Sequence, residues 1–191
     1  MKKILVLNGS PSGKKGNSAK FIRDVLKNSH VNKHAKFEVV HLNDSPYSKS
    51  LRKSMSAADA FVFVTGTYWD SWGSPLQQLL EDMTELEGDA TFMGKPAAVC
   101  VLMHSVGGKG ILSRLQGVLS TFGCLIPPMS GMVYSLVSDI ALSSKKSTHS
   151  ADFWQKEDAD LILQNLLLAT ELNVKWAEWP FDKKNPKRLW I

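Results

Sequence analysis

Short apolar runs of strand length alternate along this chain with segments of helical periodicity. The runs are rich in β-branched residues and lie at 4–7, 37–42, 60–64, 97–103 and about 124–133. Near-continuous apolar strands separated by helices are typical of a parallel sheet that is covered on both faces. The pattern therefore predicts an α/β fold, a three-layer α/β/α sandwich around a five-stranded parallel sheet of order 2-1-3-4-5. In such a sheet, ligands bind beside the carboxyl ends of the strands.

Five helices are expected between and after these strands. Apolar residues recur three and four positions apart around 21–26, 76–83 and 111–122, more weakly at 48–58, and in a long segment from about 151 to 173. We therefore expect one domain over 1–173, with a flexible loop at 143–150. A basic, Trp-rich tail over 174–191 follows, and its aromatic residues are Trp176, Trp179, Phe181 and Trp190. This tail either mediates assembly or folds back on the surface of its own chain.

Composition and charge exclude several classes of protein. At 191 residues, with 43% hydrophobic and 21% charged residues, the chain has the composition of a globular domain rather than a disordered one. Cys100 and Cys124 lie in apolar runs without paired spacing, which favours a reducing compartment and a cytoplasmic location. The first apolar stretch, 4–7, is too short for a signal peptide, and no run approaches the ~18 residues of a membrane span.

The net charge of +5 is dispersed rather than gathered into one binding surface. Its small lysine clusters are not interleaved with the aromatic platforms of nucleic-acid modules, so we expect no nucleic-acid partner. A metal site is also not expected. His30 and His34 have helical spacing, but no third ligand is near them in the sequence.

Residues 3–18 read as a buried strand that runs into a loop of Gly, Ser and Asn and then opens an amphipathic helix. Loop N–H groups and a helix N-terminus together attract phosphate. A P-loop is excluded because Lys14 stands where its second Gly belongs, and the spacing of Gly9, Gly13 and Gly16 excludes a dinucleotide fingerprint. There remains a mononucleotide phosphate site, with hydrogen bonds from Ser10, Ser12, Asn17 and Ser18. An ordinary strand–turn–helix corner is the alternative.

Two further loops follow the third and fourth predicted strands. The first contains Tyr68, Trp69 and Trp72, which could wall a planar ring, although at this density at least one of them is expected to face the core. The second runs from His104 to Gly110 and has adjacent glycines, which allow a ligand to approach the backbone closely. His104 and Lys109 are candidates there for stabilising negative charge, with simple solvation as the alternative.

The three loops together carry a family resemblance. Leu-Asn-Gly-Ser-Pro with Asn-Ser, then Thr-Tyr-Trp running into Pro-Leu-Gln-Gln-Leu-Leu, then His-Ser-Val-Gly-Gly occur in this order. Over about 3–135 the chain resembles the NAD(P)H-dependent FMN reductase family of flavodoxin-like proteins. Gly66 and Gln78 depart from it, since the family usually has Pro and Lys there.

The resemblance implies a role for each loop. The first loop would take the FMN phosphate through Ser10, Ser12, Asn17 and Ser18. Thr67, Tyr68, Trp69 and Asp70 would lie along the isoalloxazine, and Ser105, Gly107 and Gly108 would meet its pyrimidine side.

The implied function is that of an FMN-dependent NAD(P)H oxidoreductase. Electrons would pass through the bound flavin to a quinone, a nitro or azo compound, or free flavin, and the protein would form a homodimer or homotetramer. Because flavin N5 would carry the hydride, no catalytic side chain is expected. Two alternatives are a flavodoxin-type electron carrier, whose usual acidic surface is missing, and a regulatory binding module built on the same fold.

Overall fold

The sheet has five parallel strands in the order β2-β1-β3-β4-β5, as the apolar pattern predicts. The computed structural model describes residues 1–143 and 154–178. The strands are β1 (Lys2–Asn8), β2 (Ala35–His41), β3 (Ala60–Gly66), β4 (Ala97–Met103) and β5 (Gly131–Ser135). Side chains on both faces of the inner strands are fully buried, for example Ile4 and Leu5 of β1. Burial on both faces explains why these strands appear as continuous apolar runs.

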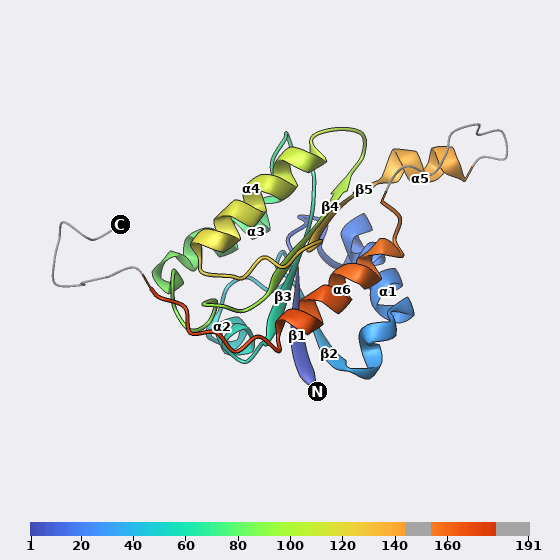
Figure 1. Ribbon diagram of the computed structural model, residues 1–191. Helices are drawn as coiled ribbons and strands as arrows, with labels where there is room; N and C mark the ends of the chain where they lie inside the picture. Colours follow the sequence, from blue (N-terminus) through green and yellow to red (C-terminus); the bar gives the residue numbers. More distant parts are fainter. Residues whose placement is uncertain (144–153, 179–191) are drawn as a thin grey trace.

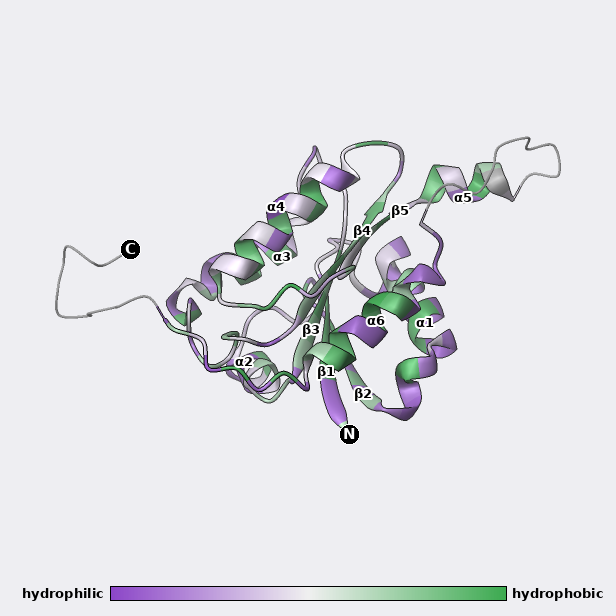
Figure 2. Cartoon of the chain, in the orientation of Figure 1, coloured by the Kyte–Doolittle hydropathy of each residue, from purple (hydrophilic) through white to green (hydrophobic). Residues whose placement is uncertain are grey.

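Helices cover both faces of the sheet and complete the predicted three-layer sandwich (Figure 1). One face is covered by α2 (Lys49–Ser56), α3 (Ser74–Asp82) and α4 (Gly108–Thr121), and the other by α1 (Asn17–Asn28) and α6 (Asp158–Ala169). Short 3-10 turns lie at η1 (Gly13–Lys15), η2 (His30–Lys33) and η3 (Thr84–Leu86). The hydrophobic sides of the five covering α-helices face the sheet (Figure 2).

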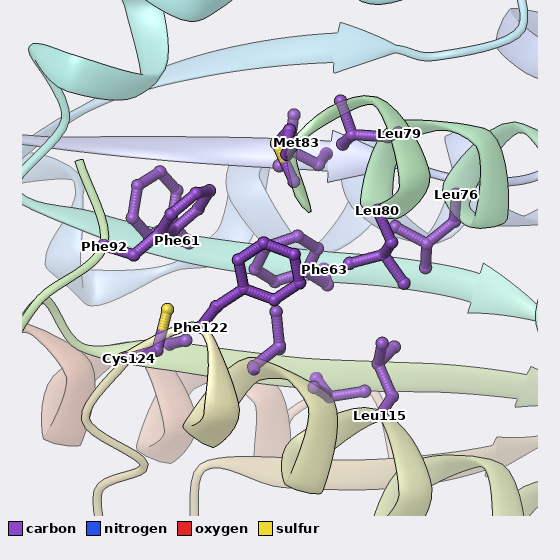
Figure 3. Close-up of a cluster of buried hydrophobic side chains, with 14 of the residues drawn as sticks. Phe61, Phe63, Leu76, Leu79, Leu80, Met83, Phe92, Leu115, Phe122 and Cys124 are labelled. Carbon is purple, nitrogen blue, oxygen red and sulfur yellow. The ribbon is translucent and has the colours of Figure 1, made fainter. Parts of the chain in front are cut away.

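An aromatic cluster fills the core between the sheet and the layer of α2, α3 and α4 (Figure 3). Phe92 lies at its centre, with ring centroids 5.5 Å from Phe61 and 5.3 Å from Phe122. Phe61 is the second residue of β3, Phe92 precedes β4, and Phe122 follows α4. The cluster therefore lies near the amino ends of the strands, away from the edge where the sequence predicts a ligand.

Two predicted elements differ from the structure. β5 begins at Gly131 rather than near 124, because the prolines at 127 and 128 provide no N–H groups for a strand ladder. The long helix expected from about 151 begins only at Asp158, where α6 starts, and residues 151–153 lie outside the described ranges. A separate short helix, α5 (Leu136–Leu142), follows β5 and projects away from the sheet (Figure 1).

The C-terminal segment after α6 crosses below the sheet and reaches the side of α4 (Figure 1). Trp176 lies against Gly94, where an added β-carbon would be 2.6 Å from Cδ1 of the indole. This contact agrees with a tail that folds back on its own chain as far as residue 178. The tail aromatics Trp179, Phe181 and Trp190, and residues 144–150 of the expected loop, lie outside the described residues. No helix in the described part of the chain is long and apolar enough to cross a membrane.

Candidate functional site

Three loops meet at the carboxyl edge of the sheet because β1, β3 and β4 are parallel neighbours. Asn8 at the end of β1 is in register with Val64 of β3, and Gly66 at the end of β3 is in register with Leu102 of β4. The loops that follow these strands therefore begin side by side. We call them the first loop (9–16), the second loop (67–73) and the third loop (104–107).

The first loop is shaped by the side chain of Asn8, which is fully buried. Asn8 Oδ1 accepts the N–H of Ser10 at 3.2 Å, and Asn8 Nδ2 donates to the carbonyl oxygen of Gly13 at 3.2 Å. The Gly13 N–H also closes back onto the carbonyl oxygen of Ser10 at 3.0 Å. One amide thus braces both ends of the turn that precedes η1.

Most N–H groups within the first loop are already used. Those of Ser12 and Lys15 bond inside the loop, and that of Lys14 donates to the Asp44 carboxylate at 3.2 Å. In the described structure these N–H groups are therefore occupied by hydrogen bonds that stabilise the turn.

The N-terminus of α1 provides the free donors instead. Its N-cap is Gly16, which has no side chain to bond the helix end, and the first N–H that bonds to the cap carbonyl is that of Lys20. The N–H groups of Asn17, Ser18 and Ala19 therefore have no helical acceptor. The hydroxyl-bearing residues Ser10 and Ser18 are buried beside this helix end.

This end of α1 fits a phosphate. It combines unpaired N–H groups, the positive end of a helix dipole and nearby hydroxyl groups, which together satisfy the oxygens of an anion. A side chain at Gly16 would fill part of this space, because its β-carbon would lie 2.6 Å from Cβ of Ser12 and 3.4 Å from Oγ of Ser10. Ser12 and Asn17 are exposed beside the same helix end.

The second loop folds as a tight two-residue turn. Tyr68 and Ser71 exchange both backbone hydrogen bonds, at 2.8 and 3.0 Å. Trp69 and Asp70 between them have φ values of +49° and +56°, the left-handed region required by a type I′ turn and normally occupied by Asn and Gly. The turn holds the Trp69 side chain fully exposed to solvent. Bulky residues in this strained conformation are unusual and occur preferentially at ligand sites.

Trp72, the other tryptophan of the second loop, has a structural role. It packs half-buried against the core, and its Nε1 donates to Oε1 of Gln77 at 2.8 Å. This confirms that at least one aromatic of the loop faces inward. The Tyr68 ring lies over Gly66, where an added β-carbon would be 3.1 Å from Cε2 of the ring. The departure of Gly66 from the family pattern therefore makes room for Tyr68.

Direct contacts join the three loops to one another. The Tyr68 hydroxyl lies 2.9 Å from Oγ of Ser10, which links the second loop to the first. The Asp70 carboxylate lies against Gly107, where a β-carbon would collide with Oδ1. Arg114 of α4 donates to the carbonyl oxygen of Asp70 and thereby braces the turn from below. Through Tyr68 and Asp70, the second loop thus touches both neighbouring loops.

The third loop lies between this junction and a separate cavity. Gly107 has a φ of +86° and caps α4, and Gly108 is buried against β5. Beyond them lies a cavity of about 630 Å³, lined by Ser105, Gly107, Gly108, Lys109, Ser135, Trp154, Asp158 and neighbouring apolar residues. The first loop does not line this cavity, so the structure brings the predicted residues together as a chain of contacts along the edge rather than as one pocket.

The remaining candidates from the sequence have ordinary surroundings. The Lys109 ammonium lies 5.8 Å from the centre of the Trp154 ring, and His104 is exposed. His30 pairs with Asp160, 3.0 Å away. No group of residues in the described ranges is arranged to hold a metal ion.

Sequence reasoning missed three residues that shape the site, namely Asn8, His41 and Asp44. His41 ends β2, and its Nδ1 lies 2.8 Å from Nδ2 of Asn8. The signal was available, because β1 and β2 are predicted neighbours and both end in a polar residue at the same register position.

Comparison with known proteins gives one family and a set of similar folds. A family model described as NADPH-dependent FMN reductase matches residues 2–135. No curated protein sequence matches the chain.

Among solved structures, a flavodoxin, WrbA-like protein from Agrobacterium tumefaciens is similar in fold, with a TM-score of 0.63 and 16% identity over 88% of this chain and 98% of its own. The NADH:FMN oxidoreductase EMOB has a TM-score of 0.61 and 18% identity over 90% of this chain and 87% of its own. FerB from Paracoccus denitrificans, a flavoenzyme NAD(P)H:(acceptor) oxidoreductase, has a TM-score of 0.57. Its identity is 19% over 90% of this chain and 96% of its own. These likenesses establish the flavodoxin-like fold.

Proposed function

Because the chain belongs to the NADPH-dependent FMN reductase family, we propose that it is an FMN-dependent oxidoreductase that uses NAD(P)H to reduce a small acceptor. The acceptor classes we propose are quinones, nitro or azo compounds, and free flavin. One observation carries the proposal: the family match spans all three loops, and these loops contact one another at the carboxyl edge of the sheet.

The FMN phosphate would be held at the N-terminus of α1. The supporting observation is the set of free N–H groups at positions 17, 18 and 19, beside the hydroxyls of Ser10, Ser12 and Ser18. The Asn17 side chain is the further candidate donor. This arrangement would hold a dianion without a lysine or arginine.

The isoalloxazine ring would lie along Thr67, Tyr68, Trp69 and Asp70, with Ser105, Gly107 and Gly108 at its pyrimidine side. The exposed indole of Trp69 and the contact of Asp70 with Gly107 support this course. When bound, FMN supplies a ring that accepts a hydride from NAD(P)H and passes electrons on. The task of these residues is therefore to bind and orient the ring, and no side chain is assigned to acid–base chemistry.

We propose a homodimer or homotetramer in the cytoplasm. In the described part of the chain, α5 leaves Val137 and Ile140 exposed, and α6 leaves Leu161 and Leu168 exposed on its outer side. Exposed apolar groups on the outer sides of these two helices favour an interface. Residues 174–191 remain a candidate assembly segment beside the domain at 1–173. Both cysteines are free thiols, in keeping with a reducing compartment.

The test is a titration of the apoprotein with FMN and with riboflavin, followed by anaerobic addition of NADPH or NADH. We expect FMN to bind more tightly than riboflavin, and the bound flavin absorbance to bleach with the reduced nucleotide. Ser18→Ala should weaken FMN binding by more than about tenfold and leave riboflavin binding unchanged, since a hydrogen bond to a charged group contributes about 1.5–3 kcal/mol. Ser113→Ala, on the exposed side of α4, is the matched control. Absence of FMN binding would overturn the proposal, and bound flavin that NAD(P)H cannot reduce would favour an electron carrier.

A further inference from the structure

The strand end next to the first loop carries a histidine that the proposed function does not use. His41 is the last residue of β2, and it is half-buried beside the end of β1. Its Nδ1 lies 2.8 Å from Nδ2 of Asn8, the residue whose amide braces the turn of the first loop. His41 therefore contacts the residue that braces the first loop, without touching the predicted ligand site.

Backbone groups fix the orientation of the Asn8 amide. The Ser10 N–H can only donate, so the atom that faces it is Oδ1, and the Gly13 carbonyl can only accept, so the atom that faces it is Nδ2. With both ends assigned in this way, the remaining N–H of Nδ2 points at His41. His41 Nδ1 must therefore accept, which makes His41 neutral with its proton on Nε2.

Protonation of His41 is incompatible with this arrangement. A proton on Nδ1 would place two donors face to face, 2.8 Å apart. Rotating the amide to accept from His41 would turn its N–H groups toward the N–H of Ser10 and its oxygen toward the carbonyl of Gly13. The unrotated amide therefore faces a second donor at His41, and the rotated amide loses both hydrogen bonds that brace the turn. Because the amide is buried, water cannot replace those bonds.

We propose that neutral His41 is a positioning residue that holds the first loop in its phosphate-binding shape through Asn8, so that protonation of His41 releases the bound phosphate. The inference rests on the proposed function for the identity of its ligand. It adds a pH dependence that none of the predicted site residues carries.

The charges around His41 favour its neutral form overall. Burial lowers the pKa of His41, Asp44 in the loop that follows β2 raises it, and Lys14 of η1 and Arg23 of α1 lower it further. The pKa is lowered on balance, so His41 is neutral at pH 7 and above. Affinity for the phosphate is therefore fully present above the pKa of His41 and is lost as the pH falls through it.

The first test uses the apoprotein and needs no flavin. Nitrogen-15 NMR of the imidazoles should show His41 with its proton on Nε2, and a titration midpoint below the ordinary value for histidine. The amide signals of Ser10 and Gly13 should shift with the His41 midpoint. A His41 that carries its proton on Nδ1, or amide signals that ignore its titration, would overturn the inference whether or not FMN binds.

The second test measures FMN and riboflavin dissociation constants from pH 5 to pH 8 for wild type, His41→Asn and His34→Asn. Asparagine keeps an acceptor near the Nδ1 position but does not titrate. Wild type and His34→Asn should lose about tenfold more FMN affinity over this range than His41→Asn. The second ionisation of the FMN phosphate, near pH 6, affects all three proteins equally.

Riboflavin separates a local effect from a global one. Because it has no phosphate, its affinity should follow the same pH curve in all three proteins. Identical FMN curves for wild type and His41→Asn would overturn the inference while leaving the proposed function standing. Failure of every protein to bind FMN would overturn the proposed function, and the NMR result would then decide the role of His41 alone.

Discussion

Single polar residues at strand ends do more to shape this site than the conspicuous motif does. Ser10, Ser12 and Ser18 attract notice in the sequence, but Asn8 holds the loop that presents them. The sequence shows Asn8 only as a member of the Leu-Asn-Gly-Ser-Pro motif, because its bracing role depends on a carbonyl five residues later and on a histidine of another strand. Side-chain bridges of this kind have no periodicity, so sequence patterns predict the loop but not what braces it.

The two cysteines provide a prediction at the same scale. Burial raises the pKa of both Cys100 and Cys124 to about 12, and neither is accessible from solvent. Because the thiolate is the reactive form, neither should react with iodoacetamide in the native protein at pH 8. Mass spectrometry should detect two modified thiols only after unfolding in urea. Modification of the native protein at the rate of a small free thiol would contradict the buried placement.

At the scale of elements, the sequence predicted strands and helices where hydrophobic periodicity decides them. β1, β3 and β4 and helices α1, α3 and α4 lie where they were expected, because burial on one or both faces imposes the pattern. The errors fall where other forces decide. Two prolines delay β5, and α5 forms on an exposed segment that has no buried stripe. The tight turn of the second loop was also missed, since Trp69 and Asp70 are not residues of a type I′ turn.

That turn should trade stability for ligand binding. Replacing Trp69→Asn and Asp70→Gly supplies the residues that a type I′ turn favours, and should stabilise the protein by about 1–2 kcal/mol as the backbone strain is relieved. The same change removes the exposed indole and should weaken FMN binding. Denaturant unfolding and FMN titration measure the two effects.

Met129→Asn is a suitable control for the turn. Met129 is also exposed with a positive φ, at +56°, but it precedes β5 at the opposite edge of the sheet. The substitution Met129→Asn should stabilise the protein without changing its affinity for FMN. If the double variant in the second loop bound FMN as tightly as wild type, Trp69 would have no part in the site.

At the scale of the whole molecule, stability and ligand binding are separated along the strands. The aromatic cluster around Phe92 (Figure 3) lies near the amino ends, and the three loops lie at the carboxyl ends. The fold could be predicted from sequence at this scale because a doubly wound sheet needs only alternating elements. The contacts between loops could not, because they join residues that no local pattern relates.

Because the aromatic cluster and the three loops lie at opposite ends of the strands, we expect a change at Phe92 to affect stability and not ligand binding. Phe92→Ala should lower the free energy of unfolding by about 3–5 kcal/mol, since it leaves a cavity between two aromatic rings in a fully buried cluster. The FMN affinity of the folded variant should match wild type. Lys53→Ala, at an exposed position of α2, is the control and should change neither quantity. A large loss of affinity in folded Phe92→Ala protein would show that the two ends of the sheet are coupled.

The contacts between the loops also bear on how the chain folds during its synthesis. Ser10 and Tyr68 are 58 residues apart, and the turn of the second loop is braced by α4, which is made later still. A ribosome must therefore release the chain through α4 before the ligand edge is complete. A ligand held by all three loops would bind only the assembled sheet and would draw late intermediates toward it by mass action. Flavin supply during translation would then influence how much of the newly made protein reaches the native state.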